Sequence, residues 1–196
     1  MKVLAAQYLA GTSLLILASG AACRSSDTAS GDRNVTPVYN KQTGVLEELV
    51  ADRKGDGRVD MRARMTGARV NSVEIDRNRD GRPDRWEYYE AAGGVQKTGA
   101  PSVLARAEEA NGPDAKVTRW EYYEHGLIRR VEEDTDADGR VDKWEQYDHG
   151  SLVQMDLDLA GRGFPDRRLI YRADGSLDRA ETDAAGDGRF KTGRRE

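Results

Sequence analysis

The stretch that decides the fold is residues 134–150, DTDADGRVDKWEQYDHG. In its first half Asp134, Asp136 and Asp138 alternate along the chain, so a tight turn can point all three carboxylates inward. Gly139 follows where the turn is sharpest and a side chain would be in the way. The second half, KWEQY, alternates aromatic and charged residues as a β-strand does. The closing DHG, like EHG at 124–126 and ADG at 173–175, is typical of a three-residue hairpin connection that ends in Gly. The stretch therefore predicts a polar loop, a strand and a tight turn, in that order.

The polar loop resembles the calcium loop of EF-hand proteins. It matches the pattern D-x-[DN]-x-[DN]-G-x5-E, in which side-chain oxygens at positions one, three, five, nine and twelve surround the ion. Oxygen ligands alone favour Ca²⁺ over zinc or copper. The resemblance implies a Ca²⁺ site formed by Asp134, Asp136, Asp138, Asp142 and Glu145.

The same loop recurs along the chain at intervals of about 24 residues, with one insertion near 93–102. Three of the loops are followed by an aromatic strand, WEYY at 86–89, WEYY at 120–123 and WEQY at 144–147. Every loop is preceded by two apolar positions, six and three residues before it. The loops start at Asp52, Asp76, Ala110, Asp134, Asp158 and Asp183. The apolar positions hold Leu46, Val70, Leu104, Ile128, Leu152 and Leu177, and then Leu49, Val73, Ala107, Val131, Met155 and Ala180.

This repeat is too short for true EF-hands. A period of about 24 residues leaves about 12 residues between loops, interrupted by a glycine turn, and two flanking helices do not fit there. Pro83 also lies where paired EF-hand loops need a backbone N–H. We therefore predict a mainly β fold of tandem β-hairpins, a MORN-like or solenoid-like sheet with EF-hand-like loops.

The loops differ in how many ligands they keep. The second loop is complete, with Asp76, Asn78, Asp80, Asp84 and Glu87. The first is a weaker candidate, because Lys54 interrupts Asp52, Asp56 and Asp60. The loops that start at Ala110, Asp158 and Asp183 lack several acids, and we expect them to be metal-free and to keep the turn with Lys or Arg, such as Arg162. The alternative for every loop is a plain Asx-Gly turn that binds no metal.

The N-terminus predicts export. Residues 1–22 have the basic, apolar and small-residue parts of a signal peptide, although a membrane anchor is an alternative. Cys23 follows at once, and the junction resembles a bacterial lipobox, which implies lipidation of Cys23. Gly20 departs from that motif. The alternative is cleavage by an ordinary signal peptidase, which would leave Cys23 as a free thiol. We expect 23–36 to be a flexible tether and 37–196 the repeat domain.

The formal net charge of −4 argues against nucleic acid as a partner, and motifs for nucleophilic catalysis or phosphate binding are missing from the sequence. The loops and WEYY strands resemble bacterial repeat lipoproteins of myxobacterial type. We expect a non-enzymatic, calcium-binding lipoprotein with a structural or adhesion role. It would be exported to the bacterial cell envelope and anchored through Cys23 at the outer membrane or cell surface. Its partner would be an envelope glycan or protein. The alternatives are a glycan-binding or carbohydrate-modifying protein that uses an Arg, aromatic and carboxylate face, and a metal-independent spacer.

Overall fold

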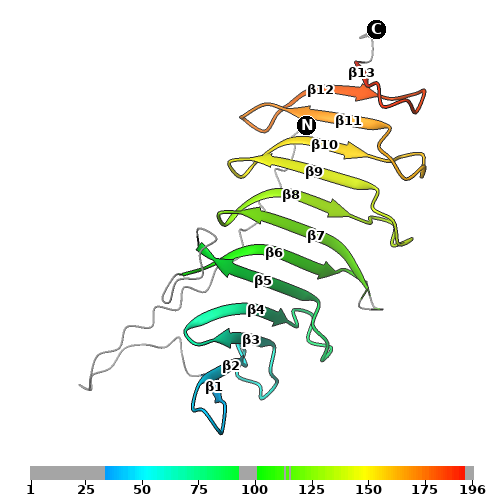
Figure 1. Ribbon diagram of the computed structural model, residues 1–196. Helices are drawn as coiled ribbons and strands as arrows, with labels where there is room; N and C mark the ends of the chain where they lie inside the picture. The colour runs from blue at the N-terminus through cyan, green and yellow to red at the C-terminus, as the bar shows by residue number, and fades with distance from the viewer. Residues whose placement is uncertain (1–33, 93–100, 113, 115, 193–196) are drawn as a thin grey trace. The chain divides into compact units, whose positions relative to one another are not determined.

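The computed structural model describes residues 34–92, 101–112, 114 and 116–192, which all belong to the compact unit Gly31–Glu196. Thirteen antiparallel strands form one open sheet in which spatial order follows sequence order (Figure 1). The described residues form no helix long and apolar enough to span a membrane. The strands are β1 Val35–Tyr39, β2 Leu46–Ala51, β3 Met61–Thr66, β4 Arg69–Ile75, β5 Arg85–Ala91, β6 Ser102–Ala110, β7 Val117–Glu124, β8 Leu127–Glu133, β9 Lys143–Asp148, β10 Ser151–Leu157, β11 Arg167–Tyr171, β12 Leu177–Thr182 and β13 Lys191–Thr192.

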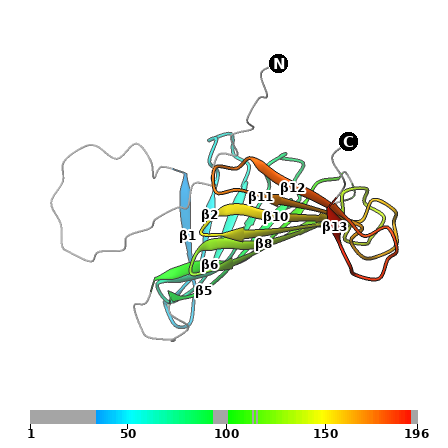
Figure 2. The same cartoon turned by 90° about the horizontal axis from the view of Figure 1, so that it is seen from above.

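This architecture confirms the predicted mainly β fold of tandem hairpins. The Asp-rich loops join strands at one end of the sheet and the short turns join them at the other (Figures 1 and 2). Strand β1 already begins at Val35, close to the end of the segment expected to be a tether. The predicted signal peptide, Cys23 and residues 93–100 of the insertion lie outside the described residues.

Two of the short turns are tighter than the sequence predicts. Glu124 pairs with Leu127, so the turn between β7 and β8 consists of His125 and Gly126 alone, with φ of 52° and 79°. His149 and Gly150 repeat this geometry, with φ of 49° and 81°. Positive φ at both central residues defines the hairpin turn whose twist suits the flanking strands. The predicted three-residue connections are therefore two-residue turns at these places.

A β-bulge in each hairpin explains the odd spacing of the apolar positions. Side chains three residues apart on a regular strand point to opposite faces. Here Glu87 pairs with Ala107 and Tyr89 pairs with Leu104, so the register shift near Ala105 returns Leu104 and Ala107 to one face. Equivalent shifts occur in the hairpins β1–β2, β3–β4, β7–β8, β9–β10 and β11–β12.

The sheet has two chemically distinct faces. The tyrosine face carries small apolar side chains between acids and tyrosines, in the rows Ala63, Val73, Glu87, Ala107, Glu121, Val131 and Glu145, and Tyr89, Leu104, Tyr123, Ile128 and Tyr147. The tryptophan face carries Trp86, Tyr88, Trp120, Tyr122 and Trp144.

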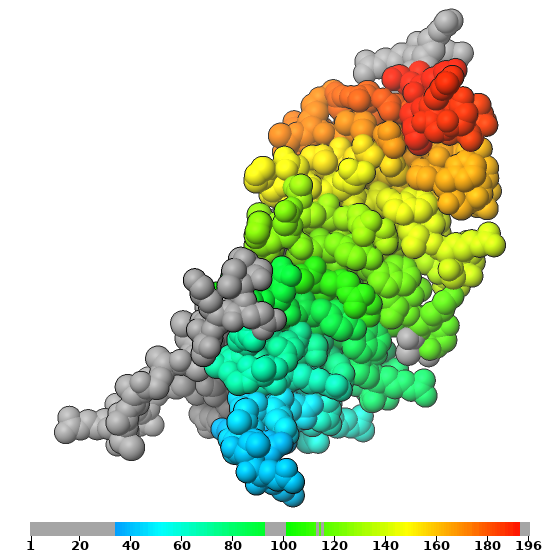
Figure 3. All heavy atoms as spheres, viewed as in Figure 1, coloured from blue at the N-terminus to red at the C-terminus, as the bar shows by residue number. Residues whose placement is uncertain are grey.

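Within the described residues both faces belong to a single layer, and side chains of successive strands lie against one another in chain order (Figure 3). The most buried apolar side chains are small, with Ala107 at 0% and Val131 at 1% exposure. Their cover comes from longer neighbours on the same face, because the described strands supply no second layer. The hydrophobic core is therefore a row of small side chains on a single sheet, and it is not enclosed between two layers.

Candidate metal site and its surroundings

The first aspartate of each acidic loop folds the loop around its own carboxylate. In loop 134–142 the Asp134 oxygens accept the N–H groups of Asp138 (3.1 Å) and Gly139 (2.8 Å). Asp158, in a loop with few ligands, accepts Arg162 N–H (3.0 Å) and Gly163 N–H. Asp52, Asp76 and Asp183 make equivalent bonds. Position one therefore has a structural role that does not depend on a metal.

Positions five and nine also bond to the backbone. Asp138 accepts Arg140 N–H (2.8 Å), which closes an Asx turn. Asp142 accepts the N–H of Thr135 (3.1 Å) and its hydroxyl (2.8 Å), and so fixes the other side of the loop. The loops are joined to one another through the backbone, because Asp158 N–H donates to the Asp142 carbonyl (2.8 Å).

Three of the predicted calcium ligands converge. Oxygens of Asp134, Asp136 and Asp138 lie within 4.8 Å of one another, with Asp134 buried and the other two exposed. One cause is a shared donor, since Asp138 N–H bonds to Asp134 and to Asp136, each at 3.1 Å. Each carboxylate oxygen has two lone pairs, so these bonds leave capacity for a cation. Among the described residues this is where three acidic side chains come close enough to hold a metal ion.

The two remaining predicted ligands of this loop lie elsewhere. Asp142 is outside the converging group and bonds to Thr135. Glu145 projects from β9 onto the tyrosine face, where it accepts the Tyr147 hydroxyl (2.7 Å) and pairs with Lys143 (2.8 Å). The structure thus brings together positions one, three and five, and holds positions nine and twelve in other bonds.

The second complete loop has similar internal bonds. Asp76 accepts Arg79 N–H (2.6 Å) and Gly81 N–H (2.9 Å), and Asp84 accepts Asn78 N–H (2.9 Å). The Asn78 amide donates to Asp80 (3.4 Å). Glu87, the predicted position-twelve ligand, pairs instead with Arg85 (2.8 Å) and accepts the Tyr89 hydroxyl (2.7 Å).

In the weaker loop, 52–60, arginines pair with the acids. Arg79 reaches over from the next loop to Asp56 (2.5 Å), and Arg53 pairs with Asp60 (2.9 Å). Asp52 is occupied by the N–H groups of Gly55 and Gly57. Basic side chains other than Lys54 therefore neutralise acids of this loop, and one of them comes from a neighbouring loop.

Cations from one loop reach other loops as well. Arg162 pairs with Asp166 in its own loop (3.8 Å) and donates to the carbonyl of Asp183 in the next loop (3.2 Å). Lys116 donates to the Ala137 carbonyl (3.4 Å), which places its ammonium group beside loop 134–142. We call Arg79, Arg162 and Lys116 the loop-bridging cations. They neutralise part of the negative charge at the loop edge, the end of the sheet where the Asp-rich loops lie.

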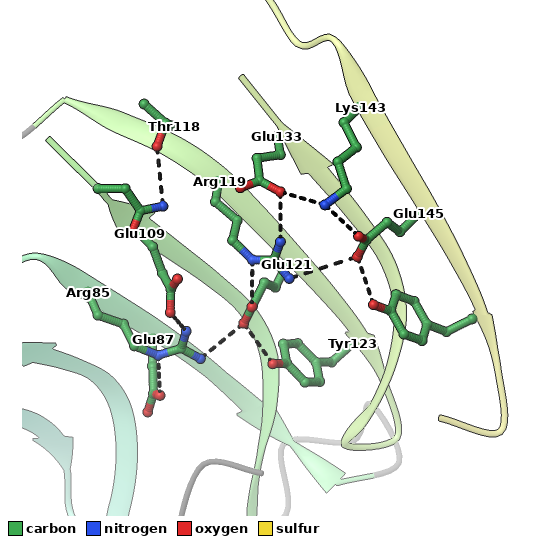
Figure 4. A network of polar contacts seen from close by, with 12 residues as sticks. Arg85, Glu87, Glu109, Thr118, Arg119, Glu121, Tyr123, Glu133, Lys143 and Glu145 are labelled. Atoms are coloured by element: carbon green, nitrogen blue, oxygen red, sulfur yellow. Dashed lines mark hydrogen bonds and ion pairs between the residues drawn. The ribbon is translucent and has the colours of Figure 1, made fainter. Parts of the chain in front are cut away.

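A network of ion pairs crosses the tyrosine face (Figure 4). Arg85 bonds to Glu87, Glu109 and Glu121, and is 9% exposed. Arg119 continues the network to Glu121 (3.1 Å) and Glu133 (3.0 Å), and Lys143 joins Glu133 to Glu145. The tyrosines Tyr89, Tyr123 and Tyr147 each donate to the glutamate two residues earlier.

The network fixes the charge states of its members. Burial raises the pKa of Glu121, but the Arg85 charge, the Tyr123 hydroxyl and Arg119 outweigh it, so the pKa lies below its usual value. Burial and the neighbouring Glu121 raise the pKa of Tyr123 to about 12. Glu121 therefore stays ionised and Tyr123 stays neutral near pH 7, which suits a structural network better than proton transfer.

No protein-family model matches the chain, and no curated protein is significantly similar to it in sequence. The resemblance to bacterial repeat lipoproteins stays a prediction.

Sequence reasoning missed the loop-bridging cations and the tyrosine–glutamate bonds. The second had a visible signal, because WEYY, WEYY and WEQY place a glutamate two residues before a tyrosine on three strands. Side chains two apart on a strand share a face, so the pair can meet. The bridging cations had no such signal, since they depend on how neighbouring loops stack.

Proposed function

We propose that this chain is a non-enzymatic, cation-binding module of the bacterial cell envelope, with calcium held at loop 134–142. The observation that carries the proposal is the convergence of Asp134, Asp136 and Asp138 oxygens within 4.8 Å. Hard oxygen donors on an extracellular loop suit Ca²⁺ with a dissociation constant of about 10⁻⁴–10⁻³ M. Bound calcium would rigidify this loop and, through the backbone bond to Asp158, the next one.

Two observations favour a binding module over an enzyme. The carboxylates buried on the tyrosine face are paired with cations and tyrosines, and Glu121 has a lowered pKa. A general acid needs a raised pKa instead. The hollows at the loop edge are open and lined by loop residues that already bond to one another, such as Arg77, Asn78 and Asp84.

Calorimetric titration of the whole chain with CaCl₂ tests the proposal. Asp136→Asn and Asp138→Asn keep the oxygen that accepts the backbone N–H and remove a charge, so we expect calcium binding to weaken at least tenfold while the fold is retained. Asp187→Asn is the matched control, because Asp187 also occupies position five of its loop and accepts Arg189 N–H (3.0 Å). It should leave binding unchanged.

Lys116→Gln adds a second readout. Its ammonium group beside loop 134–142 opposes a divalent cation, so its removal should tighten calcium binding severalfold. Absence of heat from the unmodified chain and from Lys116→Gln, together with an unchanged melting temperature, would favour the metal-independent spacer.

The envelope location is a separate part of the proposal and rests on the sequence of residues 1–23. Expression in a bacterial host followed by membrane fractionation and mass spectrometry of the N-terminal peptide tests it. We expect a lipid mass on Cys23 and release from the membrane in Cys23→Ser. A soluble protein that keeps residues 1–22 would contradict export.

A further inference from the structure

The tryptophan face repeats one arrangement of side chains on alternate strands. Trp86, Trp120 and Trp144 share one row, and Glu108, Glu132 and Asp156 lie between and beside them on the intervening strands. Neighbouring strands are about 4.8 Å apart, so the tryptophans recur about every 10 Å. The row therefore has a fixed pitch across six strands, β5 to β10.

The neighbouring row completes a repeating cell. Arg106 lies over the Tyr88 ring (4.3 Å to its centre) and pairs with Glu108 (2.6 Å). Tyr88 donates its hydroxyl to the same Glu108 (3.1 Å). In the next cell Arg130 lies over Tyr122 (4.1 Å) and pairs with Glu132 (3.0 Å), which also accepts the Tyr122 hydroxyl (3.3 Å).

The third cell has the same plan with amides. Gln146 takes the place that Tyr88 and Tyr122 have in the first two cells, and Gln154 donates to Asp156 (2.9 Å). Arg168 pairs with Asp156 (2.8 Å) from the following strand. In all three cells the acid is paired with an arginine. The row of tryptophans is therefore not surrounded by an excess of charge of either sign.

The face is accessible in the described part of the chain. The three tryptophans are half-buried within the sheet, and Arg106 and Arg130 are 40% and 50% exposed. The described strands contact mainly their sequence neighbours and form one layer, so none of them covers this face. Aromatic rings with exposed surface beside polar groups are typical of binding surfaces.

We propose that the tryptophan face binds an extended, uncharged, β-linked polysaccharide, with about one disaccharide per cell. The pitch of about 10 Å is close to the length of a disaccharide in such a chain. Indole rings offer flat apolar surfaces to the C–H faces of sugar rings, and the Glu and Arg groups between them can exchange hydrogen bonds with hydroxyls. The charge balance of each cell selects for a neutral polymer, because a polyanion or polycation would find no excess of opposite charge. This inference is independent of calcium binding at the loops.

Titration of the whole chain with cello- and chito-oligosaccharides, followed by tryptophan fluorescence and calorimetry, tests the proposal. We expect affinity to rise from disaccharide to tetrasaccharide to hexasaccharide in at least one series, as one, two and three cells are filled. Trp120→Leu keeps an apolar side chain and removes the flat ring, and should weaken hexasaccharide binding about tenfold. Tyr171→Leu on the tyrosine face is the matched control and should bind as the unmodified chain does.

Trp144→Leu provides a second variant should Trp120→Leu fail to fold, as judged by circular dichroism. Binding that does not depend on length, or that survives both substitutions in folded protein, would overturn the proposal. So would failure of both saccharide series to bind. A concentration-dependent dimer that Trp120→Leu abolishes, without saccharide binding, would assign the face to a second copy of the chain.

Discussion

At the scale of single residues, the aspartates at position one matter most. The same side chain that a calcium loop uses as a ligand here accepts two or three backbone N–H groups in every loop that begins with Asp, including loops that keep few other acids. The repetition of this aspartate along the chain is thus explained by folding alone. The converging group at 134–138 is what distinguishes a candidate metal site from a turn.

Asp158 tests the folding role, because its loop has Ala160 and Arg162 in place of ligands. Asp158→Ala should lower the free energy of unfolding by about 1–2 kcal/mol, as loss of a backbone-capping side chain does, whether or not calcium is present. Urea unfolding with and without CaCl₂ measures this. Asp174→Ala is the control, because Asp174 closes an exposed turn; an equal loss there would contradict a special role for position one.

The same residue predicts acid sensitivity. Burial raises the pKa of Asp158, but the N–H groups of Arg162, Gly163 and Gly161 lower it by more. A lowered pKa in the folded state gives stability that is present above the unfolded pKa of about 3.9 and is lost as pH falls through the folded pKa. The urea midpoint should therefore fall as pH is lowered from about 5 to 2, less steeply in Asp158→Asn. A parallel fall in both proteins would contradict this.

At the scale of the strand pair, the network on the tyrosine face takes the place of a deep apolar core. Strand β7 contributes Arg119, Glu121 and Tyr123, and its neighbours contribute the partners and the small residues Ala107 and Val131 between them. Glutamates this close to one another on one face are tolerated because Arg85, Arg119 and Lys143 lie between them.

Tyr123→Phe probes this network. Removal of the hydroxyl takes one hydrogen bond from the buried Glu121, and we expect a loss of about 1 kcal/mol in the free energy of unfolding near pH 7. Since the folded pKa of Tyr123 is raised to about 12, the stability from its neutral form is complete below about pH 10 and is lost as pH rises through 12. Denaturation at several pH values measures both effects. Tyr39→Phe, on the exposed edge strand β1, should leave the free energy of unfolding near pH 7 unchanged.

At the scale of the whole molecule, contacts run mainly between successive strands, as in repeat proteins. Stability is then approximately a sum over neighbouring strands, so a whole repeat should be removable without loss of the fold. Deletion of 134–157 joins Glu133 to Asp158, and Leu169 then takes the place of Glu145 opposite Val131.

We expect this deletion to give a folded β protein with a smaller dependence of unfolding free energy on urea, because less surface is exposed on unfolding. It should also lose the calcium response, since the converging aspartates are gone. Circular dichroism, urea unfolding and calorimetry measure these outcomes. Aggregation of the shortened chain would show that the sheet depends on contacts beyond neighbouring strands.

The sequence by itself determined the strand-rich repeat, the positions of the loops and the alternation of face chemistry, because these depend on local periodicity, glycine turns and backbone capping. Apolar residues three apart recur in the sequence, but the bulges that place them on one face became visible only in the pairing register. Only the tertiary structure decided which predicted ligands meet. Asp134, Asp136 and Asp138 share one turn, whereas Glu145 is directed by the pleat of β9 onto the tyrosine face, where Lys143 and Tyr147 hold it. The bridging of loops by Arg79, Lys116 and Arg162 was also decided there, because it depends on which loops stack side by side once the strands have paired.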